Sequence, residues 1–419
     1  MKAMIRPLFF RLVFPCVISW IVISCGFDGQ AAVLWTDRPE FVFYAEQFNA
    51  AQDRYKVEVY YYESPVQKLD EGGAFPDMAA ASWLKDASAK VTFRPLDDLF
   101  NKEVPGWAAF YPRLLDTGKI EGKQYLLPVS FNIPAMVFLS EYSQYMSNPF
   151  TITMEEIMTR SREFNAQSNG VYTRMGFSPT WNENFLFIVA VLLNAGFHEA
   201  APLAWDADAL EQAMLWVRQW ISETNTDIQA EDDFVFKYMY DPPAKLISSG
   251  RILFTYMDSS EIFTLSEERR ANLDFRWIAE NDNIPLDEAS VYFGIHKKAK
   301  AKNAAYAFAR WFFQADTQRM LLETSKSKRL METSFGIGGG FSAMRNVTEQ
   351  VFPQFYPSLL GRMPPESFLL ALAILPHHWM SIKERVILPY LKERVRHTGE
   401  EEIRPLDRRV ADWYRLNRE

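Results

Sequence analysis

The stretch at residues 32–49 reads AVLWTDRPEFVFYAEQFN and decides the fold class. Its first four residues form a short apolar run of the kind that becomes a buried strand. From Pro39 onward, Phe41, Ala45 and Phe48 recur at the spacing that places them on one face of a helix. A strand that leads directly into an amphipathic helix is the first half of a βαβ unit, so this stretch predicts an α/β fold with a mainly parallel sheet.

Apolar runs and amphipathic segments alternate in the same way along the rest of the chain. Strands are expected at Lys56–Tyr61, Met78–Ser82, Tyr125–Val129, Ala135–Leu139, Ile252–Met257 and Tyr292–His296. Helices are expected from Thr153 and from Asp208, and over Asn303–Phe313, Trp379–Val395 and Ile403–Tyr414. Because 419 residues are too many for one simple core, two lobes are expected.

The N-terminus has the composition of an export signal. Lys2, Arg6 and Arg11 give it positive charge, and the apolar run Leu12–Ile23 follows. This run is shorter than the roughly 20 residues that a membrane-spanning helix needs. A positive flank, a short apolar core and a small residue before a cut site predict a signal peptide over residues 1–24.

The cut site falls in Val22-Ile23-Ser24-Cys25, which resembles the lipobox of bacterial lipoproteins, although Ile23 is larger than usual. The resemblance implies that the signal is removed, that Cys25 receives lipid, and that residues 25–31 tether the body to the bilayer. An ordinary cleaved signal and an uncleaved N-terminal anchor are the alternatives. Cys16, the other of the two Cys, lies within the signal, so the remainder has no Cys for a disulfide or a zinc cluster.

Composition argues against several classes of function. Hydrophobic residues make up 48% of the chain, which is typical of a packed globular protein. A net charge of −8 is unfavourable for nucleic acid, because phosphate contacts need clustered Lys and Arg. Since no later apolar stretch is long enough to span a membrane, the lipid bilayer is expected to be contacted through the N-terminal lipid alone.

Five stretches carry a resemblance to a known family. They are Val33–Asp37 with the helix that follows, Phe75–Met78, Gly122–Ser130, Ser249–Tyr256, and Gly294-Ile295. In this order and spacing they resemble the sugar-binding extracellular receptors of ABC importers, the group that includes maltose-binding protein. The resemblance covers nearly the whole chain after the signal.

The resemblance implies a type II periplasmic-binding-protein-like fold, with a ligand cleft between discontinuous lobes joined by crossing strands. It places 32–130 plus 291–335 in lobe 1, and 131–290 plus 336–419 in lobe 2. Ligand would sit at the carboxyl ends of the strands, and closure about the crossings would trap it. The glycine-rich run Ser334–Phe341 departs from a typical crossing.

The resemblance also implies a function. The chain would be a monomeric receptor without cofactor, anchored at the outer face of a bacterial membrane in the periplasm or outside the cell. It would capture a sugar or another small polar solute and deliver it to the permease subunits of an ABC importer.

Sugars present apolar C–H faces and many hydroxyl groups, which suit aromatic rings and polar side chains. Side chains of these types stand after expected strands, at the first crossing or near helix starts. The candidate ligand-binding residues are Thr36, Asp37, Arg38, Trp83, Asn132, Trp181, Glu183, Asp258, Tyr292 and Trp379.

Most of these candidates have a structural alternative. Asp37 would cap a helix, Glu183 would favour a helix N-terminus, and Asp258 would serve a turn. Asn132 would fix the crossing by a hydrogen bond. Trp379 would belong to the apolar stripe of its own helix, and Trp83 to the core of a lobe.

Catalytic and metal motifs are missing from the sequence. There is no GxSxG, HExxH or P-loop pattern, and the adjacent His377 and His378 would point apart on a helix. The chain is therefore expected not to be an enzyme, nor to hold a metal. Two alternatives stay open: a two-lobed lipoprotein now used for ligand sensing or protein interaction, and an exported glycosidase whose carboxylate pair meets only in space.

Overall fold

A computed structural model describes residues 31–86, 88–100, 106–200, 203–370, 373–376, 378–397 and 403–417. The predicted signal peptide, Cys25 and all but the last residue of the predicted tether lie outside the described residues. Among the described residues, no helix is long and apolar enough to cross a bilayer.

The first sheet has six strands in the order β17-β6-β16-β3-β1-β2. Its strands are β1 (Ala32–Thr36), β2 (Val57–Tyr61), β3 (Met78–Ser82), β6 (Leu127–Phe131), β16 (Val291–Ile295) and β17 (Phe341–Ser342). β1 runs parallel to β2 and β3, but β16 is antiparallel to β3 and to β6. The sheet is therefore mixed, not mainly parallel, because β16 re-enters it from the other half of the molecule.

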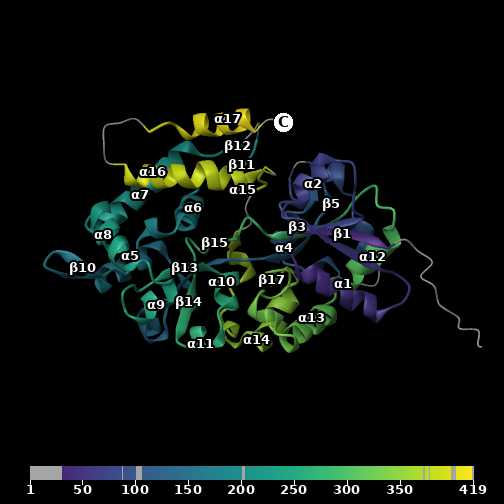
Figure 1. Cartoon of the computed structure of the whole chain (residues 1–419), viewed down its shortest axis with the longest axis horizontal. Coiled ribbons are helices and arrows are strands. Elements are labelled where there is room, and N and C mark those ends of the chain that lie inside the picture. The colour runs from purple at the N-terminus through teal and green to yellow at the C-terminus, as the bar shows by residue number, and fades with distance from the viewer. Residues whose placement is uncertain are drawn as a thin grey trace, which may run out of the picture.

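The second sheet has four strands in the order β13-β7-β14-β8. They are β7 (Pro134–Leu139), β8 (Thr151–Ile152), β13 (Thr255–Asp258) and β14 (Leu273–Ile278). Only Asn132 and Ile133 separate β6 from β7, so the chain crosses between the sheets at that point. Residues 279–290, which include β15 (Ile284–Pro285), carry it back to β16. The two-lobed α/β fold expected from the sequence is confirmed (Figure 1).

Helices cover both sheets. Those in the first half of the chain are α1 (Glu40–Ala51), α2 (Pro65–Glu71), α3 (Ala89–Thr92), α4 (Pro112–Asp116), α5 (Met154–Phe164), α6 (Glu183–Leu192) and α7 (Ala207–Thr224). Those in the middle are α8 (Ile228–Tyr238), α9 (Pro243–Ser248), α10 (Ser259–Thr264), α11 (Glu267–Arg270), α12 (Lys302–Phe312) and α13 (Ala315–Ser327). The last are α14 (Phe352–Phe355), α15 (Trp379–Ile382), α16 (Leu388–Arg396) and α17 (Leu406–Leu416).

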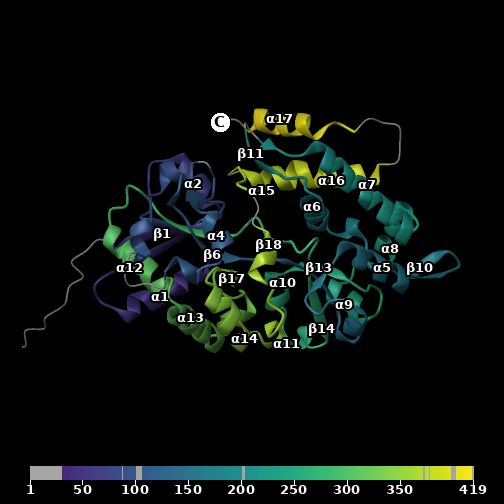
Figure 2. The same cartoon turned by 180° about the vertical axis from the view of Figure 1, so that it is seen from behind.

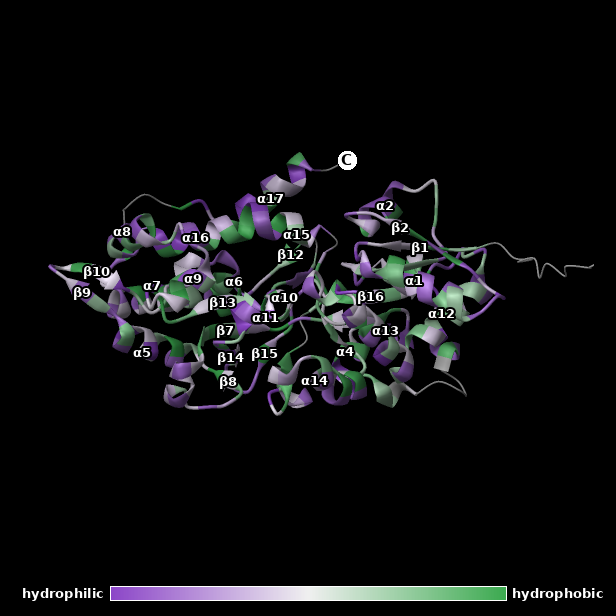
Figure 3. Cartoon of the chain, turned by 60° about the horizontal axis from the view of Figure 1, so that its bottom comes forward, coloured by the Kyte–Doolittle hydropathy of each residue, from purple (hydrophilic) through white to green (hydrophobic). Residues whose placement is uncertain are grey.

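The remaining strands are short. They are β4 (Lys119–Ile120), β5 (Lys123–Gln124), β9 (Ala166–Ser168), β10 (Val171–Arg174), β11 (His198–Glu199), β12 (Leu203–Ala204) and β18 (Leu369–Leu370). Figure 3 shows apolar and polar residues alternating around α16 and α17. The buried residues of α17 are Leu406, Val410 and Trp413, at the spacing of one helix face.

An aromatic cluster joins the two sheets at one side of the molecule. The ring of Phe263 in α10 stacks on Phe335 with centroids 4.8 Å apart, and Trp277 in β14 lies 6.0 Å from Phe341 in β17. β17 pairs with β6, so residues 341–342 belong to the first sheet. The division of the chain into the two predicted lobes otherwise stays a prediction.

The expected helix Trp379–Val395 is interrupted. α15 passes into a π-helical turn, Lys383–Ile387, before α16 begins. Pro389 lacks the N–H that a continuous α-helix would direct at the carbonyl of Arg385, which explains the break. The cap of α7 also differs from the prediction, because Asp206 rather than Asp208 accepts the bond from Ala209 N.

Candidate functional site

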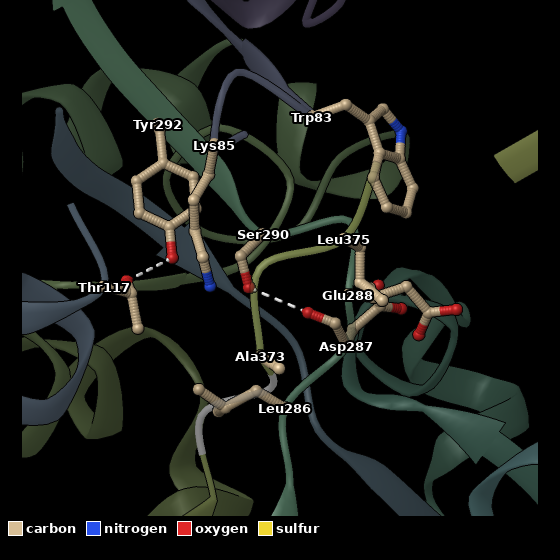
Figure 4. A pocket seen from close by; sticks show the side chains of 10 residues that line it. All are labelled: Trp83, Lys85, Thr117, Leu286, Asp287, Glu288, Ser290, Tyr292, Ala373 and Leu375. Carbon is tan, nitrogen blue, oxygen red and sulfur yellow. Dashed lines mark hydrogen bonds between the residues drawn. The ribbon is translucent and has the colours of Figure 1, made fainter. Parts of the chain in front are cut away.

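Two cavities lie between the sheets and share the side chains of Asp287 and Glu288. We call them the interlobe pockets. The first, of about 30 Å³, is lined by Trp83, Lys85, Thr117, Leu286, Asp287, Glu288, Ser290, Tyr292, Ala373 and Leu375 (Figure 4). The second, of about 110 Å³, is lined by Ile133, Pro134, Asn182, Asn184, Ile188, Tyr256, Asp258, Glu261, Asp287, Glu288 and Lys383.

Trp83 is the aromatic wall of the first interlobe pocket. It follows β3 with φ 64°, a left-handed conformation that a bulky side chain rarely adopts. Its ring packs against the core cluster of the second sheet and against a smaller cluster beside the first sheet. Strain of this kind persists only where the surroundings impose it, and it concentrates at functional sites. Trp83 is therefore held where both halves of the molecule meet.

Polar side chains from β16 and from loops beside the first sheet line the same pocket. The hydroxyl of Tyr292 in β16 lies 2.7 Å from Thr117 Oγ1, and Figure 4 shows this pair facing the Lys85 side chain. Burial raises the pKa of Tyr292 to about 12 and lowers the pKa of Lys85 to about 8. Both groups thus lie in a weakly solvated wall, where hydrogen bonds are stronger than in water.

Carboxylates and one lysine separate the two pockets. Glu288 is ion-paired with Lys383, and their side chains are only 6% and 13% exposed. Trp379 Nε1 also approaches Glu288 Oε1 at 3.5 Å. Burial, followed by the charge of Glu288, raises the pKa of Asp287 to about 7. Burial therefore favours the neutral form of the Asp287 carboxyl more than in a free aspartate.

Asp258 lines the second interlobe pocket at the end of β13. It caps α10, accepting from Glu261 N at 2.9 Å, while Glu261 accepts from Asp258 N in return. Burial raises the pKa of Glu261 above its ordinary value, while the hydrogen bond from Asp258 N lowers it and the charge of the Asp258 carboxylate raises it. Asp258 therefore caps the turn into α10, as its structural alternative expected, and also lines the second interlobe pocket.

The predicted residues Thr36, Asp37 and Arg38 do not line either pocket, but they bind the loop that does. Thr36 Oγ1 donates to Ala80 O at 2.6 Å, and Asp37 Oδ2 accepts from Ser82 N at 3.0 Å. Arg38 Nη2 donates to Ser82 Oγ at 2.7 Å. These bonds fix the end of β3, directly before Trp83.

Asn132 occupies the crossing between β6 and β7. Its Nδ2 donates to Gly339 O at 2.9 Å, and its Oδ1 accepts from Ser259 Oγ at 2.6 Å. The side chain thus links the glycine-rich run to the start of α10, as the structural alternative expected.

Three other predicted residues do not line the pockets, although Trp379 contacts the pocket-lining Glu288 through its Nε1. Trp181 stacks on Phe234 with centroids 5.7 Å apart and planes at 14°. Glu183 pairs with Lys392 at 2.7 Å. Trp379 is 0% exposed within the core of the second sheet. The structure therefore brings Trp83, Asp258 and Tyr292 to the interlobe pockets but not these three.

Sequence reasoning missed Lys85, Asp287, Glu288 and Lys383. Lys85 stands two residues after Trp83, so the same strand-end argument would have reached it. Asp287 and Glu288 lie in an irregular return segment, and Lys383 begins a π-helical turn. Neither setting has a local sequence pattern that marks a site.

The interlobe pockets combine an aromatic ring, hydroxyls, amides and charged groups. Such a set can hold a polar solute by stacking and hydrogen bonding. Groups of three or more His, Cys, Asp or Glu in metal-binding geometry are not found among the described residues.

Two sheets, a crossing between them and polar pockets at the junction define the class of two-lobed solute-binding proteins. The model of the family described as bacterial extracellular solute-binding protein matches residues 35–319, and the chain belongs to this family. Its members are binding proteins, and the family is consistent with an extracellular or periplasmic location. No curated protein matches the sequence significantly.

Solved structures share the fold over nearly their whole length. An ABC substrate-binding protein from Listeria monocytogenes in complex with cycloalternan is 14% identical, with TM-score 0.62, covering 93% of this chain and 99% of that one. The cyclic α-maltosyl-1,6-maltose binding protein from Arthrobacter globiformis is 14% identical, with TM-score 0.61 and coverage of 91% and 96%. The maltose-maltodextrin binding protein of Alicyclobacillus acidocaldarius is 15% identical, with TM-score 0.56 and coverage of 92% and 99%.

Proposed function

We propose that the protein is a lipid-anchored receptor of an ABC importer that binds a sugar or oligosaccharide in the interlobe pockets. The observation that carries the proposal is the convergence of Trp83, Tyr292 and Asp258 from two different sheets on adjoining cavities. Family membership and the sugar ligands named for the solved relatives support it. Lipid at Cys25 and delivery to permease subunits belong to the same proposal.

The size of the interlobe pockets adds a mechanical requirement. A water needs roughly 10–15 Å³ of such space, so cavities of about 30 and 110 Å³ have room for roughly ten waters together, not for an oligosaccharide. The lobes must therefore separate before a sugar enters. Hinge closure around a ligand supplies such a motion.

The experiment is a thermal-unfolding screen of the purified protein against mono- and oligosaccharides, with mass spectrometry of any ligand retained through purification. A sugar at 100 times its dissociation constant adds about 2.7 kcal/mol of stability. The shift should depend on Trp83 and survive in a Trp181→Phe control. If no sugar raises the melting temperature and no carbohydrate is retained, the receptor proposal fails.

One observation favours a second candidate, a lipoprotein that uses this fold for sensing or protein interaction. The interlobe space is small and is spanned by the Glu288–Lys383 ion pair and by Trp83. This candidate expects no sugar response in the same screen, together with capture of a partner protein that a Trp83→Ala variant does not disturb.

A further inference from the structure

A groove of about 510 Å³ shares no lining residue with the interlobe pockets. Its walls come from β7 and β14 of the second sheet, from α10 and α11, and from residues 357–362. α11, which lines this groove, lies at the lower edge of the molecule in both views (Figures 1 and 2). α15, which leads into the pocket-lining Lys383, lies toward the upper edge. We call this cavity the hinge groove.

Three arginines line the hinge groove, although the chain as a whole has a net charge of −8. Arg276 is 4% exposed and lies over the ring of Phe138. Arg362 lies over Phe275 and Arg270 over Phe263. Aromatic faces thus position all three guanidinium groups by cation–π contact.

One buried carboxylate, Asp274, faces these cations and is already saturated. Its Oδ1 accepts from Arg362 Nη1 and from Phe275 N, and its Oδ2 accepts from Arg276 Nη1 and from Ser143 Oγ. Four donors fill the acceptor capacity of a carboxylate. Asp274 therefore has no capacity for Arg270.

The guanidinium groups keep unused donors, fewest in Arg276, whose Nε donates to Asn148 O and whose Nη1 donates to Asp274 Oδ2 and to Phe275 O. Each can donate five hydrogen bonds. Among the described residues, the side chain of Arg270 donates to Phe263 O alone, and that of Arg362 donates to Asp274 alone. Burial lowers the pKa of both Arg276 and Arg362, although both are ion-paired with Asp274.

Two further carboxylates are near the groove. Glu267 lines its rim and is exposed. Glu156 acts electrostatically on Arg276 but lies 3.8 Å from Arg160 and accepts from Ser147 N. Neither carboxylate makes an ion pair with Arg270 among the described residues.

We propose that the hinge groove is a second ligand site, and that it binds a small phosphate-like oxyanion through Arg270, Arg276 and Arg362. Guanidinium groups reach the groove from α11, from β14 and from the loop after α14. Donors on separate elements suit the several oxygens of a tetrahedral anion, and charge-assisted bonds of this type are the strong ones. The site is independent of sugar binding.

The test is calorimetric titration of the purified protein with inorganic phosphate at low salt, with chloride at equal ionic strength as the blank. Arg270→Gln removes a cation without stranding Asp274, and should weaken phosphate binding at least tenfold. Glu267→Gln removes rim repulsion and should strengthen it. Arg319→Gln is the matched control, because the Arg319 side chain donates to Gln354 and does not line the groove.

Three outcomes overturn the proposal. The first is the absence of saturable heat from phosphate in the parent protein. The second is equal weakening by Arg270→Gln and Arg319→Gln, which would indicate general charge attraction. The third is unchanged affinity in Arg270→Gln when circular dichroism shows that the variant is folded.

Discussion

Trp83 and Trp379 were equivalent candidates by residue type, and the structure separates them into a pocket wall and a core side chain. Trp379 is 0% exposed and contacts the rings of Phe187 and Phe197 at 5.8 and 5.6 Å. Trp83 is partly exposed and lines the first interlobe pocket. Alanine at each position should therefore produce opposite results in stability and in ligand response.

The magnitudes follow from burial. A buried tryptophan removes about 150–250 Å² from water, which at about 25 cal/mol per Å² corresponds to roughly 4–6 kcal/mol. Substitutions of this kind in cores cost about 3–5 kcal/mol, so we expect about 4 kcal/mol for Trp379→Ala. Trp83→Ala should cost less, about 1–2 kcal/mol, because its ring is partly exposed although it packs against two apolar clusters. Trp83→Gly should cost no more, because glycine accepts φ 64° without strain.

The assay is urea unfolding followed by far-ultraviolet circular dichroism, which does not depend on the tryptophans being replaced. Sugar-induced stabilisation is measured on the same samples. Trp379→Ala should lose stability and keep its response, whereas Trp83→Ala should keep most of its stability and lose its response. A loss under about 1 kcal/mol in Trp379→Ala, together with a lost sugar response, would refute the assignment of Trp379 to the core.

Three further predictions concern the same junction. Lys383→Met should cost about 3–5 kcal/mol, because it leaves Glu288 buried without its partner, and adding Glu288→Gln should restore most of the loss in urea unfolding. The folded-state pKa of Asp287, about 7, lies above its ordinary 3.8. The contribution of Asp287 to the free energy of unfolding is therefore complete below about pH 4 and is lost as pH rises through 7. Asp287→Asn should flatten that decline when the free energy of unfolding is measured across a pH series. Gly340→Ala should destabilise by about 1–3 kcal/mol, since its Cβ would lie 2.6 Å from a backbone oxygen of the crossing strand, whereas Gly106→Ala meets nothing within 4 Å and should be neutral.

Strands buried on both faces were the easiest elements to predict. Met78–Ser82 is confirmed to the residue, because every position is buried and apolar or small. The crossing strand was expected at Tyr125–Val129 but runs over Leu127–Phe131. Its last two residues pair with β17, more than 200 positions later, and a contact of that range leaves no local pattern.

The candidate site residues show the same contrast between local sequence pattern and long-range packing. Trp83 and Asp258 stand at the carboxyl ends of β3 and β13, so the rule that ligands bind at the carboxyl ends of strands finds them, whereas Tyr292 lies near the amino end of β16 and is not reached by that rule. The same rule fails for Trp181 and Trp379. An aromatic ring that stacks on a sugar and one that stacks on Phe234 or Phe187 have the same sequence signature, and only tertiary packing distinguishes them.

The segment around Glu288 shows why the bonds of Arg38 matter although its side chain lines neither pocket. Glu288 is bound by Lys383, which belongs to the helical layer over the second sheet. The next residue, Ala289, accepts at its carbonyl from Ser82 Oγ at 3.1 Å and from Arg38 Nη2 at 3.4 Å; Ser82 ends β3 of the first sheet, and Arg38 follows β1. Adjacent residues of one short segment are thus held by opposite halves of the molecule, beside Trp83. If the lobes separate as the proposed function requires, one of these attachments must stretch or break, so on that proposal a solute that contacts Asp287 or Glu288 would act where opening begins.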